Sequence, residues 1–252
     1  MKVQKYLYRI GINDIPTPTL ENLFLLQKKH LLHVPFENLD ILRCRKIVLE
    51  EKKLFKKIVI EKRGGFCHEL NGLFFLLLNN LGFEVKRISA QVFGSIGKFG
   101  KPYDHTAIIA KVDKVEYLVD VGFGKFTFEP LKFDLDKVQT DGHNHYKITK
   151  LNHRFHVVMI QEEDGNWKYG YKFTKKHREV SEYIPMCNWL QTSPESNFTQ
   201  RKRITIPTKE GGRITLADEV LKITKGKKVI EKQVKSEEEF YRYLEQYFGI
   251  AF

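Results

Sequence analysis

The sequence contains only three cysteines among its 252 residues: Cys44, Cys67 and Cys187. Three is too few, and an odd number, for a framework of disulfide bonds, so we expect free thiols in a reducing cytoplasm. No uninterrupted apolar run approaches the roughly 20 residues that a membrane-spanning helix needs. The first residues lack the apolar core and the small-residue cleavage site of a signal peptide. These absences predict a cytoplasmic protein with no membrane partner.

Acidic residues are also fewer than basic ones. The chain has 31 Asp and Glu against 43 Lys and Arg, a formal net charge of +12. This excess could attract nucleic acid or a cosubstrate that carries phosphates. The lysines, however, are scattered singly or in pairs, and no basic stripe alternates with aromatic residues as a nucleic-acid groove requires. The pattern therefore predicts a solvated, lysine-rich surface and no nucleic-acid partner.

The spacing of apolar residues divides the chain into three parts, with no long linker, internal repeat or low-complexity segment. Residues 1–85 favour helices, over 20–31, 49–61 and 67–81. Positions in the first of these that share one helical spacing are Leu20, Leu23, Phe24, Gln27 and Leu31. Residues 86–185 favour strands, near 84–93, 106–112, 116–121, 153–161 and 166–173. Residues 186–252 contain hairpin-like runs at 203–207 and 212–216, and a closing helix capped by Ser236 and Glu239.

The most informative segment is 63–71, of sequence RGGFCHELN. Its Gly-Gly turn delivers Cys67 to the first turn of a predicted apolar helix that Gly82 closes. Free backbone N–H groups and the positive end of the helix dipole stabilise a thiolate there. The segment therefore suits a cysteine nucleophile, and the alternative is a small buried residue at a helix start. Cys44 and Cys187 have no such setting, and we expect both to be packing residues.

A cysteine nucleophile needs a base, and the predicted hairpin offers one. If Asp113 and Lys114 form a two-residue turn, Asp120 lies opposite Ala107, and His105 becomes its diagonal neighbour on the same face. A shift of one residue would place the two on opposite faces. Asp120 lies in an apolar run, where a charge needs a partner. A buried aspartate orients an imidazole and stabilises its protonated form. The alternative is a purely structural pair at the rim of a barrel.

Together these segments resemble the arylamine N-acetyltransferases over nearly the whole chain. The matching segments, in the family's order and at similar spacing, are YRIG (8–11), VPFENL (34–39), RGGFCHELN (63–71), His105 and VDVGFG (119–124). Two matches are weaker, TSPESNF (192–198), where Gln191 replaces the usual serine, and GRITL (212–216). The C-terminal part is short and divergent, so its cofactor contacts transfer least.

The resemblance implies an α+β fold with a cysteine-protease/transglutaminase-like catalytic core. Its parts are an N-terminal helical bundle carrying the nucleophile (1–85), a central β-barrel carrying the histidine and aspartate (86–185) and a C-terminal α/β lid (186–252). It implies a catalytic triad of Cys67, His105 and Asp120. The family reaction moves an acetyl group from acetyl-CoA, through an acetyl-cysteine, to an arylamine, arylhydrazine or N-hydroxyarylamine. The expected partners are therefore acetyl-CoA and a small aromatic amine or hydrazine.

Further residues of the matching motifs receive expected roles. Phe36, Val92, Phe93 and Phe123 are candidates for an acceptor pocket. Gly122 and Gly124, with the loop 97–101, are candidates for close approach of CoA to the backbone. The oxyanion would be bound by the Cys67 N–H and a second donor that the sequence does not identify. We expect an arginine–carboxylate cluster of Arg9, Glu37 and Arg63 behind the Gly-Gly turn, with Asn71 bonded to Asp120 or filling a polar gap.

A metal site is not expected. His143, His145, His153 and His156 lie close in sequence, but no cysteine or carboxylate completes a ligand set. Besides acetyl transfer, the same triad could serve an amide synthase or a thioester hydrolase, and a non-catalytic binding protein is a third class. The resemblance leaves open the physiological acceptor, the geometry of CoA binding and the oligomeric state.

Overall fold

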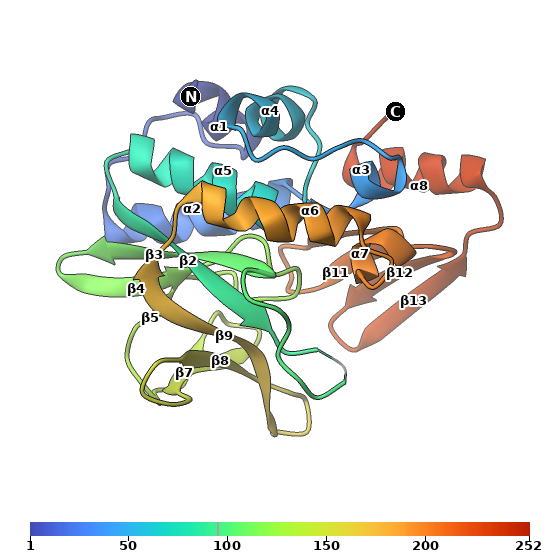
Figure 1. Ribbon diagram of the computed structural model, residues 1–252. Helices are drawn as coiled ribbons and strands as arrows, with labels where there is room; N and C mark the ends of the chain where they lie inside the picture. Colours follow the sequence, from blue (N-terminus) through green and yellow to red (C-terminus); the bar gives the residue numbers. More distant parts are fainter. Residues whose placement is uncertain (95) are drawn as a thin grey trace.

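The computed structural model describes residues 1–94 and 96–252, and Figure 1 shows its helices gathered on one side of its sheets. The N-terminal part forms α1 (Val3–Arg9), α2 (Leu20–His33), α3 (Leu39–Leu42), α4 (Glu51–Phe55) and α5 (Cys67–Asn80). A π-helical turn, Lys56–Ile60, continues α4, so the helix expected over 49–61 is present in two forms. α5 agrees with the prediction, and Gly82 follows it with a φ of +88°.

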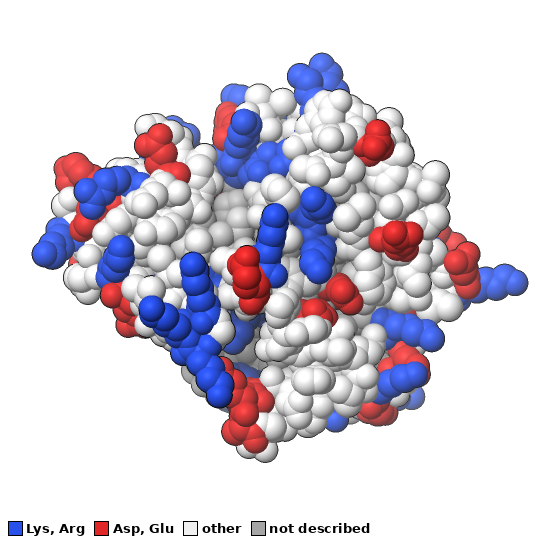
Figure 2. All heavy atoms as spheres, turned by 180° about the vertical axis from the view of Figure 1, so that it is seen from behind, with Lys and Arg blue, Asp and Glu red and all other residues white. Residues whose placement is uncertain are grey.

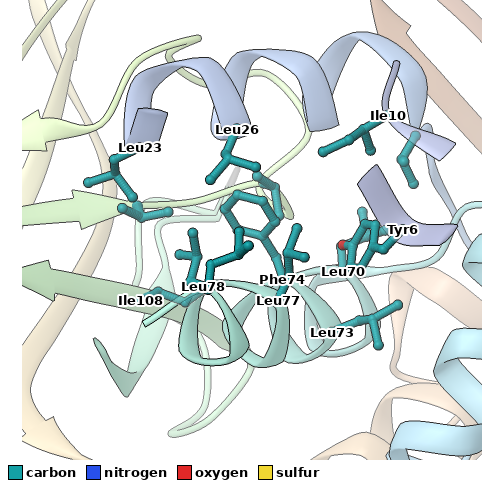
Figure 3. Packing of buried hydrophobic residues seen from close by; sticks show 14 of the residues in the cluster. Tyr6, Ile10, Leu23, Leu26, Leu70, Leu73, Phe74, Leu77, Leu78 and Ile108 are labelled. Carbon is teal, nitrogen blue, oxygen red and sulfur yellow. The ribbon is translucent and has the colours of Figure 1, made fainter. Parts of the chain in front are cut away.

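α5 is the central helix of this part, because most of its side chains are buried. Leu70, Phe74 and Leu77 are fully buried and pack against α1 and α2 (Figure 3). A helix that is apolar around most of its surface has to be enclosed by other elements. α5 also packs on β2 and β3 of the large sheet. The start of α5, where Cys67 lies, is therefore fixed between helices and sheet.

The large sheet has eight antiparallel strands in the order β5-β4-β3-β2-β9-β8-β7-β6 and forms a nearly closed barrel. Its strands are β2 (Glu84–Val92), β3 (His105–Val112), β4 (Val115–Val119), β5 (Leu131–Lys132), β6 (Gln139–Thr140), β7 (His145–Lys150), β8 (His156–Gln161) and β9 (Trp167–His177). Its interior is filled by large side chains, among them Tyr146, Tyr171 and Phe173. The predicted strands are present, although β8 starts later than expected and β5, β6 and β7 were not predicted.

The second sheet has five strands in the order β1-β10-β11-β12-β13. They are β1 (Phe36–Glu37), β10 (Arg203–Pro207), β11 (Arg213–Ala217), β12 (Val220–Lys225) and β13 (Lys228–Gln233). α8 (Glu237–Phe248) packs on this sheet through Phe240 and Leu244, and Ser236 caps it as expected. Because β1 comes from the N-terminal part, the second sheet joins the two ends of the chain. α6 (Ile184–Thr192) and α7 (Asn197–Gln200) connect the two sheets along the chain.

The structure confirms the α+β class and corrects one expectation. Cys187 is buried, but Cys44 is exposed in the loop after α3 and is not a packing residue. Among the described residues, no helix is both long and apolar enough to span a membrane. Figure 2 shows basic side chains scattered among acidic ones over the rear face. The division at residues 85 and 185 stays a prediction.

Candidate active site

Cys67 is the first residue of α5 and is only 3% exposed. The two glycines before it allow the chain to turn tightly. A side chain at position 64 would overlap the carbonyl oxygen of Pro35, and a Cβ at position 65 would lie 2.8 Å from a carboxylate oxygen of Glu69. The same Glu69 carboxylate accepts the N–H of Phe66, the residue before the helix, at 3.1 Å. The glycines and Glu69 together fix where the sulfur lies.

The hairpin of β3 and β4 places His105 and Asp120 together. Asp113 and Lys114 form its turn, both with positive φ, as in the turns that suit two-residue hairpins. Ile108 lies opposite Val119, which is the predicted register. His105 Nε2 lies 2.7 Å from Asp120 Oδ2, and both residues are at least 98% buried. The diagonal contact expected from the alternation of the strands is therefore present.

The thiol of Cys67 lies within hydrogen-bond reach of His105. Its sulfur donates to the carbonyl of Asp104, the residue before His105, at 3.6 Å. Burial alone would lower the pKa of His105, since it disfavours the charged imidazole. The charge and hydrogen bond of Asp120 outweigh burial, those of Cys67 act in the same direction, and the pKa rises to about 10. At neutral pH the imidazole can therefore hold a proton taken from the thiol.

Asp120 is held by further hydrogen bonds. Its second oxygen accepts from Asn71 Nδ2 and from the Gly122 N–H, each at 2.8 Å. Asn71 also accepts the Val121 N–H at 2.9 Å and donates to the Thr106 carbonyl at 2.7 Å. Asn71 lies one helical turn after Cys67, so α5 presents the thiol and the carboxylate's partner on one face. The expected bond between Asn71 and Asp120 is present.

Gln27 is a partner that the sequence analysis missed. Its side chain, fully buried on α2, accepts the backbone N–H of Asp120 at 3.2 Å and donates to the Thr127 carbonyl at 3.2 Å. The signal that could have identified it was a glutamine at an apolar position of a helical pattern. A polar group in such a position needs buried partners.

The aromatic residues proposed for the acceptor pocket lie in different places. The Phe123 ring lies 5.4 Å from the His105 ring, and the Tyr171 ring, which was not predicted, lies 5.0 Å from it. Phe93 packs instead on Phe99 and Tyr169. Among the named candidates, Phe123 is thus the one with a ring contact to His105.

The remaining candidates have separate contacts. Val92 packs against the barrel core, and its N–H donates to Asp104 Oδ1 at 3.0 Å. Phe36 is half-buried against Phe198. A Cβ at Gly122 would lie 2.8 Å from the Cys67 Cα, so this glycine permits close packing. Gly124 has a φ of +86°, with open space where its Cβ would be.

An ion-pair cluster lies behind the Gly-Gly turn, and its membership differs in part from the prediction. Arg63 pairs with Glu37 at 2.7 Å and with Asp40 at 3.0 Å. Lys57, which was not predicted, pairs with Asp40 at 2.9 Å and with Glu69 at 2.8 Å. Burial raises the pKa of Glu69 to about 7 against the opposing charge of Lys57. The cluster links β1, α3 and the π-helical turn to α5.

Arg9 is outside this cluster. Its guanidinium donates to the backbone carbonyls of Ile58, His33, Lys62 and Arg63 at 2.5–3.3 Å. It therefore joins α1, α2 and the approach to the Gly-Gly turn without a carboxylate. Within 1–94 and 96–252, no group of three or more His, Cys, Asp or Glu side chains could hold a metal ion.

Comparison with known proteins agrees with this architecture. Residues 19–252 match the sequence model of a family described as N-acetyltransferase. A Salmonella typhimurium relative, named arylamine N-acetyltransferase / N-hydroxyarylamine O-acetyltransferase, is 29% identical over 98% of this chain and 88% of its own. The arylamine N-acetyltransferase of Mycolicibacterium smegmatis is 32% identical over 82% of this chain and 77% of its own. The structure of Mycobacterium marinum arylamine N-acetyltransferase in complex with CoA covers 99% of this chain and 93% of its own, with a TM-score of 0.90 and 26% identity.

Proposed function

The chain belongs to the arylamine N-acetyltransferase family, and from this we propose that it moves an acetyl group from acetyl-CoA to an arylamine, arylhydrazine or N-hydroxyarylamine by way of an acetyl-cysteine at Cys67. The observation that carries the proposal is the buried hydrogen bond of 2.7 Å between His105 and Asp120, beside a cysteine at the start of α5. Cys67, His105 and Asp120 act as nucleophile, base and orienting carboxylate.

In the first half-reaction, His105 takes the proton of Cys67 and the thiolate attacks the thioester carbonyl of acetyl-CoA. The new bond joins the acetyl carbon to the Cys67 sulfur, and the bond to the CoA sulfur breaks. His105 returns the proton to the departing thiolate of CoA. The N–H of Cys67 is one of the free donors at the start of α5, so it is suited to bind the oxyanion.

In the second half-reaction, the aromatic amine attacks acetyl-Cys67. Its nitrogen is neutral at pH 7, so no proton has to be removed from it before it attacks. His105 takes a proton from the attacking nitrogen as the bond to the Cys67 sulfur breaks. Asp120 balances the charge on the imidazole in both half-reactions. Phe123, which is partly exposed beside His105, is suited to hold the flat ring of the acceptor, and the buried Tyr171 ring supports it from the barrel core.

We assign a weaker part in substrate binding to the remaining motif residues. Gly124 combines a left-handed backbone with open space around it, which suits the approach of the pantetheine arm to the backbone. Val92, Phe93 and Phe36 stay weaker candidates for contact with this arm or the acceptor, since they pack on the barrel core, on Phe99 and on Phe198 respectively. Gly122 serves packing, since its N–H is already bonded to Asp120.

Mass spectrometry of the intact protein tests the proposal. Incubation with acetyl-CoA should add one acetyl group at Cys67, and an aromatic amine should remove it with formation of the acetylated amine. The exposed Cys44 and the buried Cys187 give matched controls, because Cys44→Ala and Cys187→Ala should still be acetylated. Cys67→Ala should not.

Other outcomes identify the competing functions. Loss of the acetyl group in buffer at the same rate with and without amine would indicate a thioester hydrolase. Transfer only to an amine within the acyl donor would indicate an amide synthase. The absence of any adduct on reduced, folded protein would contradict an enzymatic role for Cys67.

A further inference from the structure

A cavity of about 190 Å³ lies between α4, α5, β2, β3 and the 3₁₀ turn Val180–Tyr183. Neither Cys67, His105 nor Asp120 lines it. His68 and Thr106 do line it, and they directly follow Cys67 and His105 in the chain. Because successive strand residues point to opposite faces, Thr106 turns away from the face of β3 that carries His105. The cavity is therefore separate from the site described above.

Two polar atoms around this cavity, His68 Nδ1 and Arg87 Nε, have no hydrogen-bond partner among the described residues, and the Thr106 and Tyr183 hydroxyls have none except each other. Each belongs to a side chain more than nine-tenths buried, and all four residues line the cavity. Buried polar groups in folded proteins are nearly always hydrogen-bonded, so this unused hydrogen-bonding capacity around one space indicates an occupant.

The protonation of His68 defines one requirement on the occupant. His68 Nε2 lies 2.8 Å from the carbonyl of Tyr103, so this nitrogen carries the hydrogen. Burial lowers the pKa of His68 to about 3, and the ring is neutral at pH 7. Nδ1 then has a lone pair and no hydrogen. The occupant must offer a hydrogen-bond donor at this position.

Arg87 defines the opposite requirement. It is 7% exposed, and none of the ion pairs that the described residues form includes it; burial lowers its pKa against the more distant charges of Tyr183 and Glu179. Its guanidinium stacks over the Phe75 ring at 4.3 Å. The acidic residue of the cavity wall, Glu51, is paired with the amino group of Met1 at 2.7 Å. A buried cation of this kind requires an anionic partner.

The remaining wall is hydroxyl or aliphatic. Burial raises the pKa of Tyr183 against its hydrogen bond with the Thr106 hydroxyl, so the phenol keeps its hydrogen at neutral pH, as an aliphatic hydroxyl also does. Both hydroxyls can donate to an acceptor beside Arg87. Leu54 and Leu76 give the cavity an apolar side. Its volume slightly exceeds the roughly 150 Å³ of a protein cavity that binds benzene.

We propose that this cavity is a second binding site, for a small monocarboxylate that carries a hydroxyl group on a short apolar body. The carboxylate accepts from Arg87 and from the hydroxyls of Thr106 and Tyr183. The hydroxyl of the ligand donates to His68 Nδ1, and the apolar body packs on the leucine side chains.

Isothermal titration calorimetry with 2-hydroxy-4-methylpentanoate tests the proposal on the whole wild-type protein. One molecule should bind per chain, more tightly than 4-methylpentanoate, which lacks the hydroxyl, and than 2-hydroxy-4-methylpentanamide, which lacks the charge. Arg87→Met should weaken binding of the acid by about tenfold or more. His68→Phe should abolish the preference for the hydroxylated acid.

Lys86→Met is the matched control. Lys86 neighbours Arg87 on β2, but it pairs with Glu116 at 2.9 Å and does not line the cavity. Its replacement should leave binding of the acid unchanged. Calorimetry requires no turnover, so the result does not depend on acetyl transfer.

Three results would overturn the proposal. The first is no binding of the acid to the wild type, and the second is binding by Arg87→Met and His68→Phe that is as tight as binding by the wild type. The third is a crystal structure with the acid elsewhere and water alone in the cavity. If Arg87→Met does not fold, the crystal structure of the wild type with the acid decides between occupation by ligand and by water.

Discussion

The side chain of Gln27 accepts a hydrogen bond from the backbone N–H of Asp120, a residue 93 positions later in the chain. The same side chain donates to the carbonyl of Thr127. Gln27 is fully buried, so neither bond competes with water. A helix of the N-terminal part thus positions the strand end that carries the proposed orienting carboxylate.

Replacement of this positioning residue, Gln27→Met, keeps the volume and removes both bonds. The Asp120 N–H and the Thr127 carbonyl then lose their partners, which costs about 1–3 kcal/mol of unfolding free energy for each buried group. We expect kcat to fall by more than KM changes, and the pH dependence of kcat/KM to shift as Asp120 moves relative to His105. Urea unfolding and a pH–rate profile measure the two effects.

The control for Gln27 is Gln139→Met. Gln139 makes a similar pair of bonds to the backbone of Lys132, at 2.7 and 2.9 Å, but at an exposed site. Its replacement should change neither kcat nor the pH profile. A Gln27→Met enzyme that loses stability but keeps the wild-type profile would show that Gln27 has a structural role only.

The charge of Asp120 is tested by Asp120→Asn, which keeps the shape of the side chain. The His105 pKa of about 10 results from Asp120 and Cys67 acting against burial. Without the carboxylate charge, burial prevails and the pKa falls. We expect kcat to drop roughly 10²–10⁴-fold and the loss of kcat/KM at high pH to begin at lower pH. A pH–rate profile up to about pH 10 measures the shift.

The same pKa determines a contribution to stability. The pKa of His105 rises on folding from 6.5 to about 10, so its stabilisation is complete below pH 6.5 and is lost as the pH rises through 10. Asp120→Asn should reduce this dependence. Asp113→Asn, in the turn of the same hairpin, is the control and should change neither property. An unaltered profile in Asp120→Asn would exclude control of the imidazole by this carboxylate.

Sequence reasoning paired His105 with Asp120 because that contact depends on local rules, whereas the proposed triad with Cys67 came from the family resemblance. A two-residue turn determines the register of β3 and β4, and alternation then brings His105 and Asp120 to one face. The start of α5 followed from the Gly-Gly turn and the apolar run. These features depend on neighbours within one hairpin or one helix.

The features that were missed depend on partners far along the chain. β1 has only two residues, and its pairing with β10 joins positions about 170 residues apart, which no local pattern encodes. Lys57 belongs to a lysine pair that is typical of a solvated helix face, yet it is buried among carboxylates that other segments supply. Cys44 shows the opposite error, because it was expected to pack in the core and is exposed.

The buried lysine gives a sharp test of the ion-pair cluster. Lys57→Met should leave Glu69 and Asp40 without their shared cation, at a cost of about 3–5 kcal/mol in unfolding free energy. The neighbouring Lys56 is exposed and pairs with Glu61 at 3.4 Å. Lys56→Met should therefore cost less than about 1 kcal/mol. Equal stability of the two variants in urea unfolding would mean that the cluster contributes little to the fold.

Gly122 gives the last prediction, because the segment that follows β4 approaches the start of α5 at this residue. A Cβ here would lie 2.7 Å from Asn71 Nδ2 and 2.8 Å from the Cys67 Cα, closer than real side chains allow. Gly122→Ala must therefore displace the segment around Gly122 from Cys67 and Asn71. A misplacement of about 1 Å costs on the order of 10²-fold in rate, and we expect a loss of kcat of that size.

Gly72→Ala is the matched control for Gly122→Ala, since Gly72 lies in α5 and a Cβ there meets only Leu54, at 3.7 Å. It should keep kcat and stabilise the helix by up to about 1 kcal/mol, because alanine favours helices over glycine. Acetyl transfer and thermal unfolding measured on both variants separate the two effects. Full activity in Gly122→Ala would show that the contact of Gly122 with α5 tolerates displacement, and that the thiol does not depend on this close packing for its position.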